Sequence, residues 1–173
     1  MGDRAILGVL AYSACRVGEL VKLDIGSVKQ NGEHRVVMVE GKGGKGRMVP
    51  LHPEAAERLM MWIEVSGGGQ DLDGPLFRPV RSARGFGWDG FRRLALTARA
   101  VQNLVKRYAA ETFLDPAISV HSLRVTALTS TRERGADIID LQDFAGHADP
   151  RTTLTYIRTR SRLSHSPAYV LRY

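Results

Sequence analysis

The stretch GHADPRTTLTY, residues 146–156, holds a histidine and a tyrosine nine residues apart. His147 lies between two expected helices, because a helix-ending glycine precedes it and the helix-start pair Asp149 and Pro150 follows it. Tyr156 comes about two turns into the second helix, from where it can face the same cleft as the histidine. The alternative is that the Tyr156 ring packs in the core and that His147 makes a structural hydrogen bond.

Two further motifs place charged or titratable side chains one helical turn apart. HSLR puts His121 and Arg124 on one face of an expected helix. CRVGEL puts Arg16 at a junction between helices, with Glu19 one turn later. Taken alone, the first motif is a weak signal and favours a solvated helix face. In the second, Glu19 either orients Arg16 for a function or forms an exposed ion pair of small value.

The segment EGKGGKGR, residues 40–47, is predicted to form the glycine-rich tip of a small hairpin, because β-forming valines precede it and RMVPL follows it. Lys42 lies at this tip. The segment is not a P-loop, since the G-x-x-x-x-G-K-[ST] pattern is absent and the context is a hairpin instead of a strand followed by a helix. A lysine on a glycine-rich tip is often only part of a turn.

Together these residue types suit the attack of a phenol on a phosphodiester. Two arginines can clamp the non-bridging oxygens, and a histidine can donate a further hydrogen bond to the pentacoordinate transition state. A lysine can protonate the departing 5′ oxygen, while the tyrosine attacks phosphorus and holds it covalently. We expect no metal and no cofactor, because cationic side chains supply the positive charge.

In order and approximate spacing, CRVGEL, GKGGKGR, HSLR and GHADPRTTLTY resemble the catalytic domain of the tyrosine recombinases of phage-integrase type. The resemblance covers residues 4–157, and the order of six positions is more specific than any single motif. It implies a mainly α-helical domain with a small antiparallel β-sheet, an α+β fold. It also implies that the domain cleaves one DNA strand at a time, forms a 3′-phosphotyrosine and transfers the strand to a 5′ hydroxyl.

The resemblance implies a role for each matching position. Arg16 and Arg124 are expected to bind the scissile phosphate. His121 is expected to be the general acid/base near the nucleophile, and His147 to hydrogen-bond the phosphate. Glu19 matches an acidic position that supports the site.

For the tyrosine, the resemblance implies attack on phosphorus, and for the lysine it implies protonation of the leaving 5′ oxygen. Tyr156 is the expected nucleophile, and Lys42 the expected general acid. Lys45 is a second candidate for the acid role, and we prefer Lys42. The position directly after the H-x-x-R arginine departs from the family, since it holds Val125 where a residue such as histidine is usual.

The expected domain organisation is a catalytic domain at residues 1–157 and a basic tail at 158–173. The tail either packs on a neighbouring subunit or is a frayed basic terminus. The family usually carries an N-terminal helical domain that grips the other face of DNA, and we expect this core-binding domain to be absent from the chain. The chain is then a fragment, or it lacks that domain by nature.

The predicted elements are mostly helical. We expect helices at residues 4–14, 17–24, 53–63, 98–110, 121–135, 136–146 and 149–157, and one hairpin at 34–51. The segment 78–93 mixes five arginines with glycines and aromatic residues, and it is predicted to be a long surface loop. It either contacts the DNA backbone or is simply solvated. The DNA-binding candidates are Lys45, Arg81, Arg84, Arg92 and Arg93.

Composition and charge favour one globular domain with a polyanionic partner. The chain has 173 residues, of which 43% are hydrophobic and 25% charged, and its formal net charge is +7. No run of 18 apolar residues occurs, and the start does not read as a signal peptide. Cys15 is the single cysteine, so it cannot form a disulfide within the chain, and a reducing cytoplasm is expected.

The expected partners are double-stranded DNA and further copies of the chain, a tetramer on DNA, with no membrane and no small-molecule substrate. The expected location is the cytoplasm, in association with the nucleoid. Two other functions stay open at this point. One is a type IB topoisomerase-like enzyme that relaxes supercoils, and the other is a DNA-binding module with an inert site.

Overall fold

The computed structural model describes residues 1–41, 44, 46–82 and 88–157, and it leaves the side chains of 81–82, 88–89 and 156–157 undescribed. The α-helices are α1 (Gly2–Ser13), α2 (Val17–Leu20), α3 (Pro53–Val65), α4 (Ala98–Glu111), α5 (Val120–Glu133), α6 (Ile138–Ala145) and α7 (Pro150–Ile157). The strands are β1 (Val28–Asn31), β2 (His34–Glu40), β3 (Gly46–Pro50), β4 (Val80–Ser82) and β5 (Trp88–Phe91), and two short 3-10 turns are η1 (Ile25–Ser27) and η2 (Gly68–Gln70). The prediction of a mainly α-helical fold with a small antiparallel sheet is confirmed.

The expected hairpin is part of a three-stranded antiparallel sheet in the order β1-β2-β3. Val37 pairs with Val28 on one side and with Val49 on the other. Val37, Val39 and Val49 are buried, because residues two apart on a strand share one face. The prediction that 78–93 is a loop is wrong, since β4 and β5 pair antiparallel there, with an irregular register.

Helix ends follow the expected capping residues at the C-terminal end of the chain. The Asp137 carboxylate accepts a hydrogen bond from the backbone N–H of Ile139. Gly146 ends α6 in the left-handed region, with φ of +61°. Asp149 accepts from the backbone N–H of Arg151 at 2.8 Å, and α7 begins at Pro150.

The second helix is shorter than expected, because tertiary pairing takes over its last turn. It ends at Leu20, and the chain then forms an isolated bridge between Asp24 and Pro75. The backbone N–H of Ile25 donates to Gly74 at 3.0 Å. These bonds to a distant segment end the helix where local propensity alone would continue it.

The main core lies between α1, α3, α4 and the three-stranded sheet. Leu10 and Leu59 are fully buried where α1 packs on α3. Trp62 packs edge-on against Phe91 of β5, and its indole N–H donates to the carbonyl of Leu76 at 2.7 Å. This core therefore joins most of the first two thirds of the chain.

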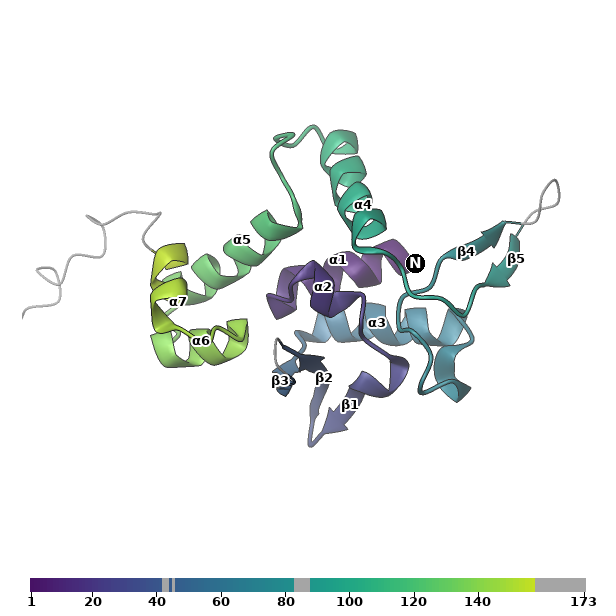
Figure 1. The fold of residues 1–173 in the computed structure, drawn as a ribbon, viewed down its shortest axis with the longest axis horizontal. Coiled ribbons are helices and arrows are strands. Elements are labelled where there is room, and N and C mark those ends of the chain that lie inside the picture. The colour runs from purple at the N-terminus through teal and green to yellow at the C-terminus, as the bar shows by residue number, and fades with distance from the viewer. Residues whose placement is uncertain (42–43, 45, 83–87, 158–173) are drawn as a thin grey trace, which may run out of the picture.

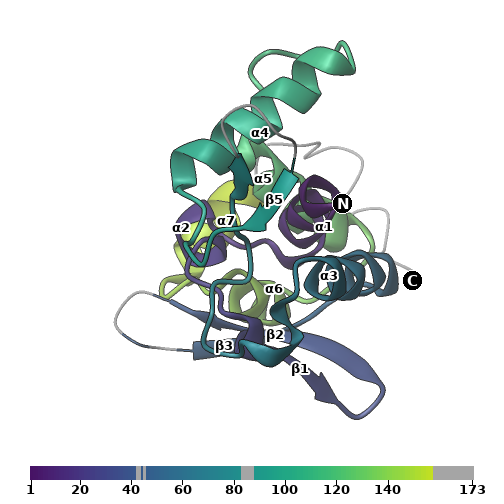
Figure 2. The same ribbon diagram turned by 90° about the vertical axis from the view of Figure 1, so that its right-hand side faces the viewer.

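A second, smaller apolar cluster holds the C-terminal helices. Its fully buried members are Ala14, Leu128, Leu141 and Ala145, from α5, α6 and the end of α1. Figure 1 shows α5, α6 and α7 grouped at one end of the molecule and β4–β5 at the other. In Figure 2, α4 projects away from the three-stranded sheet. None of the described helices is long and apolar enough to cross a membrane.

Candidate functional site

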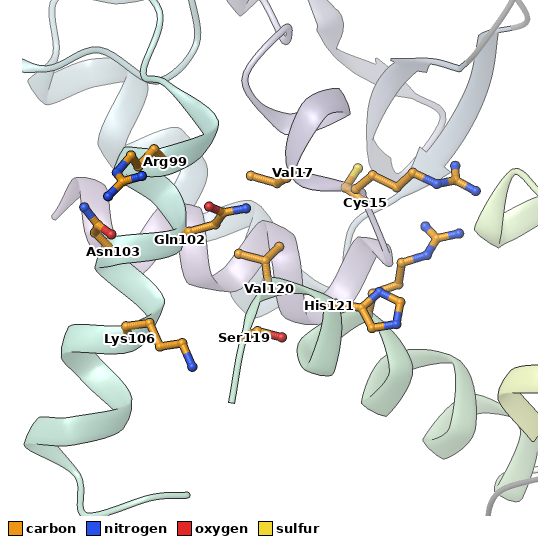
Figure 3. A pocket seen from close by; sticks show the side chains of 11 residues that line it. Cys15, Val17, Arg99, Gln102, Asn103, Lys106, Ser119, Val120 and His121 are labelled. Atoms are coloured by element: carbon orange, nitrogen blue, oxygen red, sulfur yellow. The ribbon is translucent and has the colours of Figure 1, made fainter. Parts of the chain in front are cut away.

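A pocket of about 600 Å³ opens between α4, α5 and the start of α2. Arg16, His121 and Arg124, from two of the predicted motifs, all line it. The opposite wall is one face of α4, whose side chains Figure 3 shows across from His121. The members of that face are Arg99, Gln102, Asn103 and Lys106. Four of the described lining residues are cationic and none is acidic, so the pocket suits an anion.

Arg124 is almost fully buried, with 3% of its side chain exposed. Its guanidinium donates to the backbone carbonyl of Ala14 and, at 2.6 Å, to that of Ala145. Both carbonyls lie at the C-terminal ends of helices, α1 and α6, where the partial charge is negative. Arg124 therefore joins two helix ends while it borders the pocket.

His147 is buried beside Arg124, at 6% exposure. Its Nε2 lies 2.8 Å from Arg124 Nη2 and its Nδ1 lies 2.9 Å from Thr153 Oγ1. Because a guanidinium only donates, Nε2 accepts and Nδ1 carries the proton that it donates to the hydroxyl. Burial lowers the pKa of His147 to about 4, and the positive charge of Arg124 acts in the same direction. The imidazole is therefore neutral at pH 7.

Glu19 accepts hydrogen bonds from two arginines. Arg16 Nη1 donates to Oε1 at 2.9 Å, and the Arg16 backbone N–H donates to Oε2 at 2.9 Å. Arg47 donates to both oxygens, with Nη1–Oε1 at 3.1 Å and Nη2–Oε2 at 2.9 Å. Burial raises the pKa of Glu19, but the hydrogen bonds from Arg47 and Arg16 outweigh it and lower the pKa to about 2.

The alternative of an exposed ion pair is wrong for Glu19, because only 8% of its side chain is exposed. Arg16, by contrast, is 45% exposed and faces the pocket. The buried carboxylate thus holds a guanidinium whose other edge is open to a ligand. This is the arrangement expected where an acidic residue orients an arginine.

Arg47 is the residue of this network that sequence reasoning missed. It stands in GKGGKGR, where the glycines and lysines drew attention to the turn. Its signal is the alternation along β3, because Arg47 and Val49 lie two residues apart and Val49 is buried. A charged side chain on the inward face of a strand needs a buried partner, which here is Glu19.

Several predicted residues fall on parts of the chain that the structure does not describe. The backbone of residue 156 belongs to α7, the helix that also carries Thr153, and nothing is described of its side chain. The tail at 158–173 lies outside the described residues. So do Lys42, Lys45 and Arg84, together with the side chains of Arg81 and Tyr156.

The other two DNA-binding candidates are exposed. Arg92 lies directly after β5. Arg93 makes a two-pronged ion pair with Asp71, with Nε–Oδ2 at 2.9 Å and Nη2–Oδ1 at 2.8 Å. The hydrogen bonds from Arg93 outweigh the smaller effect of desolvation and lower the pKa of the Asp71 carboxyl.

Cys15 is fully buried next to Arg16. Burial raises the pKa of its thiol, which keeps it in the unreactive neutral form. Within the described ranges, no group of three or more His, Cys, Asp or Glu side chains comes together as a metal site would require.

Comparisons with known proteins agree on one family. The family model of the phage integrase family matches residues 1–162. The chain is 35% identical over 160 residues to the tyrosine recombinase XerC of Corynebacterium efficiens, covering 92% of this chain and 47% of that protein. It is 36% identical over 154 residues to XerC of Pelobacter propionicus, covering 89% and 46%. The chain thus spans about half the length of these curated relatives.

Solved structures share the fold. A crystal structure of XerA recombinase superposes with a TM-score of 0.77 at 26% identity, covering 98% of this chain and 58% of that one. XerH site-specific recombinase bound to its difH substrate gives a TM-score of 0.70 at 22% identity, covering 97% and 45%. From the family match over nearly its whole length, and from this fold, we conclude that the chain belongs to the phage integrase family of tyrosine recombinases.

Proposed function

We propose that this chain is the catalytic part of a site-specific DNA recombinase that cleaves and rejoins strands through a 3′-phosphotyrosine. The observation that carries the proposal is that Arg16, His121 and Arg124 border one cationic pocket in a member of this family. The relatives named XerC are recombinases by name, which favours this function over a topoisomerase or an inert module.

The proposed reaction begins with the scissile phosphate between the two arginines. The exposed edge of Arg16 and the pocket side of Arg124 donate to the non-bridging oxygens and stabilise the charge that builds up in the transition state. Neutral His147 accepts a hydrogen bond from Arg124 and so holds its guanidinium in place. For its expected hydrogen bond to the phosphate, His147 has to give up one of these two contacts, because Nε2 accepts from Arg124 and Nδ1 donates to Thr153.

The covalent step exchanges one phosphate ester for another. The Tyr156 oxygen attacks phosphorus and loses its proton, which His121 accepts as the general base. The bond from phosphorus to the 5′ oxygen breaks, and Lys42 protonates that oxygen. A 5′ hydroxyl of the partner strand then attacks the phosphotyrosine, and the same groups work in reverse.

We further propose the assignment of domains, partners and location. Residues 1–157 form the catalytic domain, and the basic tail 158–173 packs on a neighbouring subunit. The substrate is double-stranded DNA bound by a tetramer, with Lys45, Arg81, Arg84, Arg92 and Arg93 as DNA contacts. The protein then acts in the cytoplasm, on the nucleoid.

The proposal is tested by trapping the covalent adduct. The chain is incubated with a pool of random-sequence duplexes, each nicked so that the short strand beyond the cut diffuses away. We expect a denaturant-resistant protein–DNA band whose DNA sequences converge on one site. Tyr156→Phe removes the attacking oxygen, so it abolishes the band while noncovalent DNA binding stays nearly intact.

Two control results would contradict the proposal. A band that persists in Tyr156→Phe means that another residue attacks, and no band from the wild-type chain means that the site is inert. Once a site is known, paired sites and a supercoiled plasmid are tested side by side. Relaxed plasmid without recombined product identifies a topoisomerase instead.

A further inference from the structure

Arg47 lies on β3, where the three-stranded sheet meets α2 and the end of α6. Only 13% of its side chain is exposed. Its two terminal nitrogens donate to the two carboxylate oxygens of Glu19, at 3.1 and 2.9 Å. Its Nε donates to the backbone carbonyl of Phe144 at 3.2 Å. One guanidinium therefore joins three segments that lie far apart in the sequence.

The end of α6 is shaped to receive this guanidinium. Gly146 has φ of +61°, and a Cβ built at this position lies 2.6 Å from Arg47 Nη1 and 2.9 Å from Arg47 Cζ. Any side chain there displaces either the arginine or the backbone. The absence of a Cβ lets the chain approach Arg47 closely, directly before the buried His147.

We propose that Arg47 is a positioning residue of the strand-transfer site, an inference that rests on the proposed function. Through Glu19 it fixes the orientation of Arg16, the half-exposed arginine of the pocket. Through the end of α6 it fixes the segment that begins with His147. Arg47 is not among the described residues that line the pocket, so it acts on the reaction only through these neighbours.

The geometry calls for arginine specifically. A planar guanidinium offers five N–H donors in fixed directions, and here three of its nitrogens point at three acceptor atoms on two segments. A lysine ammonium has the same positive charge but lacks the planar arrangement of N–H donors. Reacting groups must be held to within about 0.5 Å of their working geometry, and such a fork restricts its neighbours to one arrangement.

The first experiment compares Arg47→Met with Arg58→Met, a matched control on α3 whose side chain is 46% exposed. It measures single-turnover cleavage of a nicked duplex that the wild-type chain cleaves. For Arg47→Met we expect the rate at saturating DNA to fall by roughly 10–100-fold, as when other residues that support a site are removed. DNA affinity should change by less than about threefold, because Arg47 does not touch the DNA.

Arg47→Lys should recover only part of the rate, and Arg58→Met should match the wild type. An Arg47→Met rate within about twofold of the wild type overturns the proposal. So does a loss of affinity as large as the loss of rate, since that is the result of a direct DNA contact or of general unfolding.

A second pair of variants tests the contact between Arg47 and Gly146 by changing a glycine, so the arginine itself stays in place. Gly146→Ala brings a methyl group against Arg47, whereas Gly32→Ala, at φ of +57°, brings one into open space. Both carry the same left-handed backbone penalty, so their difference reports the collision. We expect Gly146→Ala alone to lower the cleavage rate in the saturated complex. Equal rates in the two variants overturn the proposal.

A third measurement needs no cleavage. Arg16 and Arg47 face Glu19 directly, and Cys15 and His147 are its nearby titratable neighbours. In Arg47→Met, carbon NMR of the Glu19 carboxyl should show its pKa rising from about 2 toward 4.5, whereas Arg58→Met leaves it in place. An unchanged titration overturns the role of Arg47. A shifted titration in a chain that forms no adduct supports the contact and refutes the proposed function alone.

Discussion

The main core and the C-terminal helices are stabilised by different kinds of contact. The main core is a large apolar cluster that spans α1, α3, α4 and the three-stranded sheet, and Leu59 is one of its fully buried members. Among the described residues, the cluster between α5, α6 and the end of α1 has four buried apolar side chains, two of them alanines. There the polar side chains of Arg124, His147 and Thr153 are buried as well.

The proposed site lies along the seam between these two regions. Arg16 belongs to the first region, His121 and Arg124 to the second, and Glu19 and Arg47 join them. Apolar packing tolerates small shifts, whereas a hydrogen-bonded ion pair specifies distance and direction. The polar contacts between the two regions therefore fix the positions of the proposed site residues more precisely than apolar packing alone would.

The largest effect on strand cleavage is expected from replacing Arg124, which lies where the two regions meet. Arg124→Ala removes a proposed phosphate ligand and takes away the guanidinium that pairs with the carbonyls of Ala14 and Ala145, so strand cleavage should fall by roughly 10²–10³-fold or more. Arg132→Ala, at an exposed arginine on the same helix, is the control. Single-turnover adduct formation measures both. Only a few-fold loss in Arg124→Ala would rule out the clamp.

The apolar clusters themselves should differ in their response to truncation. Leu59→Ala should lower the free energy of unfolding by about 4 kcal/mol, because the large core cannot collapse around the cavity. Leu141→Ala should cost about 2 kcal/mol, because the smaller cluster can relax. Urea unfolding followed by circular dichroism measures both variants. Equal costs would mean that the two regions are packed alike.

Mild acid should weaken the polar contacts of the buried His147 before it affects the apolar core. The pKa of His147 is about 4 in the folded protein and ordinarily 6.5, so the unfolded chain binds this proton more readily. Stability from this group is complete above pH 6.5 and declines as the pH falls to 4, by up to about 3 kcal/mol.

The measurement is urea unfolding at pH 7 and pH 5, in the wild type and in His147→Gln. Glu19 contributes little in this interval, because its ordinary pKa of 4.5 and its folded pKa of about 2 both lie below pH 5. The variant should show a flatter pH dependence than the wild type. Identical slopes would exclude His147 as the cause.

The smallest effect is expected at an exposed ion pair. Glu54 and Arg58 pair at 3.3 Å on the surface of α3, with about half of each side chain exposed. Glu54→Gln should change the free energy of unfolding by less than about 0.5 kcal/mol, because water screens such pairs. Thermal unfolding is the measurement. A larger loss of unfolding free energy would show that an exposed ion pair stabilises this protein without being buried.

Local sequence signals predicted the helices well where capping residues mark their ends. Asp137 stands directly before α6, and Gly146 directly after it. Asp149 stands directly before α7. The segment of the β4–β5 pair was predicted wrongly to be a loop, although its two strands are close together in the sequence. The second helix is shorter than predicted because the chain after it pairs with a distant segment. Local propensity carries no information about such partners.

The sequence by itself determined the helical pattern, the candidate residue types and their order along the chain, since all of these follow from local spacing and side-chain chemistry. Only the tertiary structure decided that Glu19 is shared by two arginines, that His147 is buried against Arg124, and that Arg47 points inward. The physical reason is that burial and hydrogen bonding between residues 23 to 97 positions apart arise only when the chain packs.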